Sequence, residues 1–202
     1  MENMFIKTII AGNSIFENIK PVVHEPLFQH YGISTTWIDL VDNIWVALWF
    51  ACYKANSSGG CARYLHFEKR NPFSEPSAKA YILLIGTDFA PTGVPGYHRG
   101  KSCETVDLRV AAPSIFLRPH AQHGLLFRMK GTGAMRPIDY AEQIRGIISI
   151  NLREALSWLG EAPTLSVHGL FPPPLYDAGY RMLLDGTFEG RPEIGSIALV
   201  GA

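Results

Sequence analysis

The polar and aromatic residues best suited to chemistry gather in one short run, Gln29-His30-Tyr31-Gly32. An imidazole can donate, accept or carry a proton, and a phenol can donate a hydrogen bond or stack on a flat ring. The run stands directly before residues 33–41, which alternate apolar and polar side chains, and an apolar-rich stretch that ends at Ala55. Polar groups held beside a buried helix can form a site. The same groups can also be hydrogen-bonded within a turn, as most buried polar groups are.

Two further polar side chains stand where core residues are expected. Asp39 lies between apolar residues, and a buried carboxylate must be paired. We therefore expect Asp39 to pair with Arg118 or to hold helix N–H groups. Gln122 lies between two segments that read as strands, 113–117 and 124–128, which is an unusual place for an amide. An amide cannot act as a general base, so Gln122 would position a substrate rather than move a proton.

Other reactive side chains form weaker patterns. His120 and His123, together with His30, invite a metal site. Their His-x-x-His spacing lacks the helical i, i+4 step and an accompanying acid motif, so no metal is predicted. Cys103 follows His98 by five residues and leaves a Cys-His hydrolase as a minor alternative, because closeness along the chain is not closeness in space.

Composition limits the classes of function. The chain has 202 residues, 47% of them hydrophobic, and 18 basic side chains balance 18 acidic ones. No overall basic field is therefore available to attract a nucleic-acid backbone or an anionic membrane. Three cysteines without a CxxC pair argue against a disulfide framework or a zinc ribbon. The N-terminal residues lack a signal-peptide layout, and no run approaches about eighteen apolar residues. A cytoplasmic protein without membrane contact is expected.

The elements that must position these side chains begin with a helix over about 43–55, capped by Asp42 or Asn43. Apolar side chains fall on two of its faces, so this central helix is expected to be buried nearly all round. One face carries Ile44, Leu48, Ala51 and Ala55, and the other carries Trp45, Trp49 and Tyr53.

The remaining pattern favours a single α+β domain with a mixed or antiparallel sheet and C-terminal helices. Strands are predicted over residues 80–86, 113–117, 124–128 and 144–150, and helices over 152–160 and 175–184. The Gly- and Pro-rich loop at 91–100 lacks the phosphate-binding pattern of a P-loop and is expected at the surface. Residues 185–202 are expected to form a loosely ordered tail, which leaves 1–184 as the domain.

Three blocks of this sequence resemble the FRG-domain family. The first has Gln29-His30-Tyr31-Gly32, Ser34-Thr35-Thr36, Asp39, and then Val46-Ala47-Leu48 with Phe50-Ala51, where the family pattern reads QHYG-x-P-T-R-L-L-D-W-T and VALxFA. The second has Arg118-Pro119 with Ala121 to Leu125, similar to R-x-x-x-Q-x-G-x-F, and the third has Leu170-Phe171-Pro172 before the last helix. The blocks occur in the family's order and span most of the chain.

The resemblance implies a layout similar to ADP-ribosyltransferases, with NAD as a substrate rather than a resident cofactor, and a role in bacterial defence or toxin systems. In such a site donors hold the pyrophosphate or ribose, an aromatic ring stacks on nicotinamide, and an amide or acid acts near the ribose. On this basis the catalytic residues would be Gln122 and His30, and the substrate-binding residues would be Tyr31, Thr35, Asp39 and Arg118.

The sequence also departs from the family pattern. No Phe-Arg-Gly motif precedes Gln29, the usual arginine before Asp39 is Thr36, and the usual Trp-Thr after it is Leu40-Val41. These departures motivate a second hypothesis, a non-catalytic binding module that has lost its catalytic residues. Its target would be a protein or a nucleic acid, and four tryptophans and eight tyrosines are available for contacts.

Overall fold

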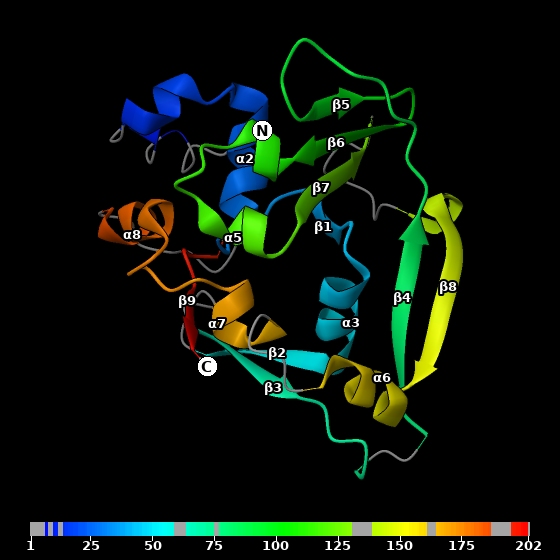
Figure 1. Ribbon diagram of the computed structural model, residues 1–202. Helices are drawn as coiled ribbons and strands as arrows, with labels where there is room; N and C mark the ends of the chain where they lie inside the picture. The colour runs from blue at the N-terminus through cyan, green and yellow to red at the C-terminus, as the bar shows by residue number, and fades with distance from the viewer. Residues whose placement is uncertain are drawn as a thin grey trace.

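The computed structural model describes residues 7, 10–11, 14–58, 64–74, 77–130, 139–160, 165–186 and 195–201 (Figure 1). Its helices are η1 (Ser14–Asn18), α2 (Pro21–His30), α3 (Ile44–Cys52), α4 (Leu108–Ala111), α5 (Leu117–Ala121), η3 (Ala141–Gln143), α6 (Leu152–Leu159), α7 (Val167–Leu170) and α8 (Ala178–Asp185). Its strands are β1 (Ile38–Val41), β2 (Tyr53–Ser58), β3 (Tyr64–Lys69), β4 (Lys79–Ile85), β5 (Tyr97–Arg99), β6 (Cys103–Asp107), β7 (Gly124–Met129), β8 (Ile144–Asn151) and β9 (Leu199–Gly201).

The strands form three small sheets. The first is antiparallel with the order β1-β7-β6-β5, and the second joins β2, β3 and β9, with β9 parallel to β3. The third is the antiparallel pair β4-β8, which Figure 1 shows as a ribbon along one side of the molecule. The expected α+β class is confirmed, with mixed and antiparallel pairing distributed over three sheets.

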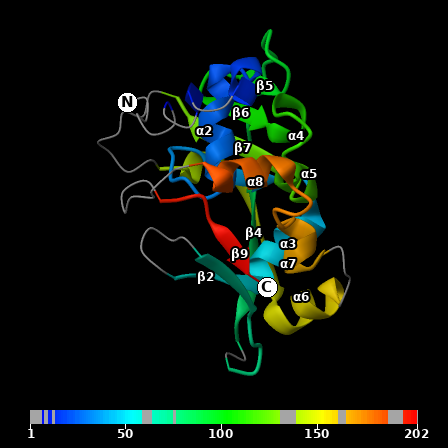
Figure 2. The same cartoon turned by 90° about the vertical axis from the view of Figure 1, so that its left-hand side faces the viewer.

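Two hydrophobic clusters form the core. The first gathers around α2, β6, β7 and α8, and the second lies between α3, the ribbon, α6 and α7. Figure 2 shows α2 and α8 on the side of the first cluster and α3 and α6 on the other. The amphipathic helix α6 contributes Leu152, Ala155 and Leu159 to the second cluster. Asn151 caps this helix by accepting a hydrogen bond from the Arg153 N–H.

The central helix is shorter and less buried than its sequence indicates. Asn43 caps it through Oδ1, which accepts from two backbone N–H groups, but α3 ends at Cys52 instead of Ala55. Residues 53–58 leave the helix because they pair in register with β3, and this tertiary pairing outweighs local helix propensity. Ile44 and Trp45 are about half exposed, at 51% and 50%, so one side of the helix faces solvent.

Three of the four predicted strands are confirmed, and one is wrong. Strands at 80–86, 124–128 and 144–150 are confirmed as β4, β7 and β8. The strand expected at 113–117 is wrong, because the Phe116 N–H bonds to the Pro113 carbonyl in a turn and Leu117 begins α5. The last helix begins at Ala178, after an Asp177 cap, instead of Leu175.

The lead-in to the polar run is also a helix. Helix α2 covers residues 21–30, although this segment contains two prolines. Pro21 stands at the start of the helix, where a missing N–H is tolerated, and Pro26 lies inside it. Gln29 and His30 are therefore the last residues of a helix, and the turn begins at Tyr31.

Part of the expected loose tail is packed against this turn. The Ala198 N–H donates to the Tyr31 carbonyl at 2.9 Å, and β9 pairs with β3. Gly32 has a φ of +113°, and a Cβ there would lie 2.6 Å from the Ser196 carbonyl oxygen, so only glycine fits this approach. The expectation for 185–202 is therefore corrected for residues 195–201, while 187–194 and 202 lie outside the described residues.

Candidate functional site

Three of the predicted site residues join one hydrogen-bonded chain at the end of α2. His30 Nδ1 lies 3.2 Å from Asp39 Oδ1, and Gln29 Nε2 donates to Asp39 Oδ2 at 3.2 Å. Thr35 Oγ1 donates to Gln29 Oε1 and accepts from the Trp37 N–H. Partial burial works to raise the pKa of Asp39, but the hydrogen bonds from His30 and Gln29 outweigh it and lower that pKa. This hydrogen-bonded group reaches the surface at Asp39, whose side chain is 55% exposed.

The second ring nitrogen of His30 is enclosed by the fold. His30 Nε2 is buried and has no hydrogen-bond partner among the described residues. When Nδ1–H donates to Asp39, Nε2 carries an unpaired lone pair, which costs about 1–3 kcal/mol in a buried place. The imidazole packs over Gly124, where a Cβ would lie 2.9 Å from Nε2. Glycine at 124 is what leaves room for this ring.

Arg118 is a deeply buried cation next to this hydrogen-bonded group. Its side chain is 1% exposed, and Nη1 donates to the His30 carbonyl oxygen at 3.0 Å. The guanidinium carbon lies 4.5 Å from the ring centroids of Tyr31 and Tyr180 and 5.3 Å from that of Phe171. Tyr31 and Tyr180 belong to the first hydrophobic cluster and Phe171 to the second, so a cation stacked on aromatic faces joins the two.

Tyr31 is fully buried in the same cluster, and its hydroxyl is already used. The phenol donates to Asp177 Oδ2 at 2.7 Å, and this carboxylate also accepts from the backbone N–H groups of Arg118 and Tyr180. Burial, with the Asp177 charge, raises the pKa of Tyr31 far above its ordinary value. In this conformation Tyr31 cannot stack on a nicotinamide ring, because Arg118 and the core enclose it.

Gln122 and Arg118 do not occupy the positions that the sequence predicts. Gln122 ends α5, instead of lying between two strands, and its Nε2 donates to the Leu170 carbonyl at 2.8 Å. The predicted Asp39–Arg118 pair is wrong, because Asp39 bonds to His30 and Gln29. His30, Thr35 and Asp39 therefore form one group, while Gln122 faces α7.

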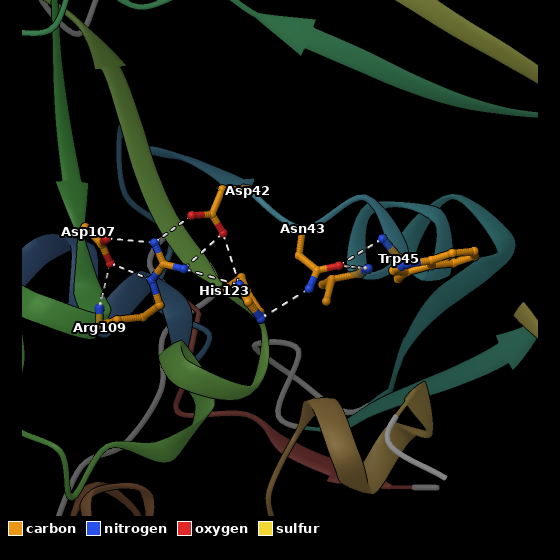
Figure 3. A network of polar contacts seen from close by, with 7 residues as sticks. Asp42, Asn43, Trp45, Asp107, Arg109 and His123 are labelled. Carbon is orange, nitrogen blue, oxygen red and sulfur yellow. Dashed lines mark hydrogen bonds and ion pairs between the residues drawn. The ribbon is translucent and has the colours of Figure 1, made fainter. Parts of the chain in front are cut away.

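A second polar network, missed by sequence reasoning, lies at the other end of β1 (Figure 3). Arg109 donates to both oxygens of Asp42 at 3.0 and 2.7 Å, and to both oxygens of Asp107 at 2.9 and 2.7 Å. His123 Nδ1 lies 3.1 Å from Asp42 Oδ1, and His123 Nε2 lies 3.2 Å from Asn43 Nδ2. These six contacts join the ends of β1 and β6 to the starts of α3, α4 and β7.

The cap of α3 sets the tautomer of His123. Asn43 Oδ1 accepts from the N–H groups of Trp45 and Val46, so its Nδ2 must face His123. His123 Nε2 then accepts a hydrogen bond from Asn43, and Nδ1–H donates to Asp42. In this tautomer Arg109 Nη1, which lies 3.2 Å from His123 Nδ1, is a close neighbour of that nitrogen and not a hydrogen-bond donor to it. His123 has a φ of 53°, a left-handed conformation that is uncommon outside glycine.

Electrostatics hold this network in its charged state. Hydrogen bonds from Arg109 and His123 lower the pKa of Asp42 against the opposing effect of burial, and the two carboxylates raise the pKa of Arg109. The sequence singled out Asp42 and Asn43 as helix caps, but no motif points to Arg109, which lies far along the chain from Asp42. The network can orient a neutral imidazole, and it also fastens five elements together.

The Cys-His alternative loses its geometric basis. Cys103 Sγ donates to Asp88 Oδ1 at 2.6 Å, whereas the His98 ring stacks on Phe89 with centroids 3.6 Å apart. Burial, together with Asp88, raises the pKa of the Cys103 thiol, which disfavours the reactive thiolate. Over the described ranges, no three His, Cys, Asp or Glu side chains are placed to hold a metal ion, and no helix is long and apolar enough to cross a membrane.

Comparison with protein-family models, with curated proteins and with solved structures found no match to this chain.

Proposed function

We propose that the chain is an FRG-type domain that serves as a non-catalytic binding module. One observation carries the proposal. The three blocks that resemble the family meet around a single side chain, since Arg118 of the second block contacts His30 and Tyr31 of the first and Phe171 of the third. The Gln122 contact with Leu170 ties the second block to the third again. The shared residues thus lie at the centre of the scaffold.

The use already made of these side chains favours binding over catalysis. The Tyr31 hydroxyl donates a hydrogen bond to Asp177, and the Gln122 amide N–H donates one to a backbone carbonyl. The Arg118 guanidinium is enclosed by aromatic rings. A transferase would need such groups directed at a substrate, within hydrogen-bond reach of the reacting atoms. A domain that only presents a surface needs them as a rigid interior, in the cytoplasmic setting that the sequence predicts.

Titrating NAD into the full chain by calorimetry tests the proposal. We expect no saturable heat up to millimolar NAD and no release of nicotinamide over hours. Saturable heat that disappears in both His30→Ala and Thr35→Val, but persists in His120→Ala, would contradict it. His120 is the matched control because it is an exposed histidine on α5 with no part in either network.

A second function rests on a separate observation. His30 Nε2 is buried without a partner beside the half-open group formed by Gln29, Thr35 and Asp39. A ribose hydroxyl would reach that nitrogen only if the fold opened on the side of the ring that lies over Gly124, as an NAD-binding, ADP-ribosyltransferase-like site in a defence or toxin system would require. The same calorimetry separates the two functions, since only this one predicts heat that depends on His30.

A further inference from the structure

The outward face of the β4-β8 ribbon carries large apolar side chains that the fold does not cover. Tyr81, Leu83 and Ile147 are 58%, 50% and 59% exposed. Leu83 stands directly opposite Ile147 and Tyr81 opposite Ser149, so the three apolar side chains are neighbours on one face. The other face is occupied where Ala80 and Ile82 pack into the second hydrophobic cluster, whereas Leu84, further along β4, is 46% exposed. An apolar strip of this kind on a regular element marks an interaction surface.

Each end of this strip carries a positive charge. Lys79 begins β4 and Arg145 lies near the start of β8, and both side chains are exposed. Over the described part of the chain neither charge has a hydrogen-bond or ion-pair partner. Ser149 and Asn151 on the same face are uncharged, and neither β4 nor β8 contains an acidic residue.

The positive charges at the two ends of the strip favour an acidic partner over a second copy of this chain. A second copy of this chain would bring Lys79 and Arg145 against the same two cations, and like charges across an interface disfavour association. An acidic partner has the complementary pattern. Lys79 is opposite Asn151, and from Asn151 to Arg145 an extended strand covers about 20 Å at ~3.3 Å per residue.

We propose that the outward face of the ribbon binds an extended protein segment with two acidic residues six positions apart and apolar residues at the second and fourth positions between them. The apolar side chains would lie on Tyr81, Leu83 and Ile147, and the two carboxylates would meet Lys79 and Arg145. The alternation follows from the two-residue period of an extended segment, which turns every second side chain to the same face. This inference rests on the proposed binding function and names its surface.

Fluorescence anisotropy with a labelled peptide Glu-Thr-Leu-Thr-Ile-Thr-Glu and the full chain tests the proposal. We expect saturable binding that weakens as salt is added. The double variant Lys79→Glu/Arg145→Glu should bind about tenfold more weakly and should bind a peptide with lysines at both ends instead. Leu83→Ser should weaken both combinations, and Lys54→Glu, an exposed change on β2, should leave binding unchanged.

Four results would overturn it. Equal affinity for the acidic and the lysine peptide would exclude charge selection, and no binding at millimolar peptide would exclude the surface. Tight binding of single-stranded DNA, or a dimer that Leu83→Ser dissociates, would assign the face to a nucleic acid or to a second copy. Circular dichroism of each variant reports whether it folds. If the peptide does not bind and NAD gives no saturable heat, only the proposed peptide-binding surface is rejected. If NAD gives saturable heat that depends on His30, the proposal of a non-catalytic binding module is itself rejected.

Discussion

The Arg118 guanidinium donates to the backbone carbonyl of His30 across 3.0 Å, from α5 to the last residue of α2. The rest of the guanidinium lies on aromatic rings rather than on a carboxylate. A buried cation of this kind is tolerated because the rings and the nearby Asp177 charge offset part of its lost hydration. The position of the polar run therefore depends on a side chain almost ninety residues away.

Arg118→Met should destabilise the fold. The change leaves the His30 carbonyl without its donor and removes the positive charge near the buried Asp177, and losses of this kind are about 2–4 kcal/mol. Urea unfolding followed by tryptophan fluorescence measures the change. Arg181→Met, at an exposed position on α8, is the control and should stay within about 0.5 kcal/mol of the parent. Equal stability of the two variants would contradict the claim that Arg118 stabilises the contact between the two hydrophobic clusters.

Tyr31→Phe should lower stability by about 1–3 kcal/mol, because the buried Asp177 loses one of its donors. It should also change how stability depends on pH above pH 10. The pKa of Tyr31 is higher in the folded state than its ordinary 10.0, so its stabilising effect is complete below pH 10 and is lost as pH rises above it. The variant should therefore unfold with a shallower dependence on pH between 10 and 12. An unchanged slope would contradict the buried phenol.

Gly124→Ala should force the His30 ring to move, because the new methyl would lie 2.9 Å from Nε2 and closer still to Cε1. We expect a loss of about 1–3 kcal/mol, typical of overpacking. In a His30→Ala background the same change should cost much less, and a double-mutant cycle by urea unfolding measures that difference. Gly93→Ala has open space around its Cβ and serves as the control. Additive effects would mean that the ring does not rest on Gly124.

His123→Asn should be less damaging than His123→Ala. Residue 123 has a φ of 53°, which asparagine tolerates better than alanine does, by about 1 kcal/mol. An asparagine amide can also keep a contact with Asp42. Thermal unfolding of the two variants gives the comparison. Identical transition temperatures would show that backbone strain at this position has no measurable effect.

Asp42→Asn should reduce the loss of unfolding free energy that occurs as the pH is lowered. The pKa of Asp42 is lowered in the folded state, so its contribution is present above the ordinary value of 3.8 and is lost as pH falls through the folded value. The side chain is 45% exposed, so solvent screening keeps the effect to about 0.5 kcal/mol. Urea unfolding at pH 7 and at pH 3 should show a smaller difference for the variant than for the parent. A larger difference would contradict the Arg109 pairing.

Local periodicity predicted the elements that are stabilised locally. The apolar runs of β4, β7 and β8 and the capped stripe of α6 follow directly from their side chains. The end of α3 did not, because it depends on pairing between Tyr53 and Lys69. The helix α2 was hidden by Pro26, which is usually read as a helix breaker.

The sequence singled out residues that the fold brings together only in part, and whether they form a functional site stays a prediction. His30, Thr35 and Asp39 do share a hydrogen-bonded chain, as their spacing around a turn allows. Burial of Tyr31 could not be read from one sequence, since it depends on Asp177 nearly 150 residues later. The Arg109 network was missed for the same reason, because its members are ordinary surface residue types brought together by the sheet.

The close contact between Gly32 and the segment 195–201 has a consequence for how the protein is made. The Tyr31 carbonyl cannot accept from the Ala198 N–H, and β3 cannot pair with β9, until residues 198–201 have been synthesised. Contacts of such long sequence separation form slowly. While residue 198 is still inside the ribosome, the turn after α2 remains uncovered, and the emerging chain exposes an apolar surface that a chaperone can hold.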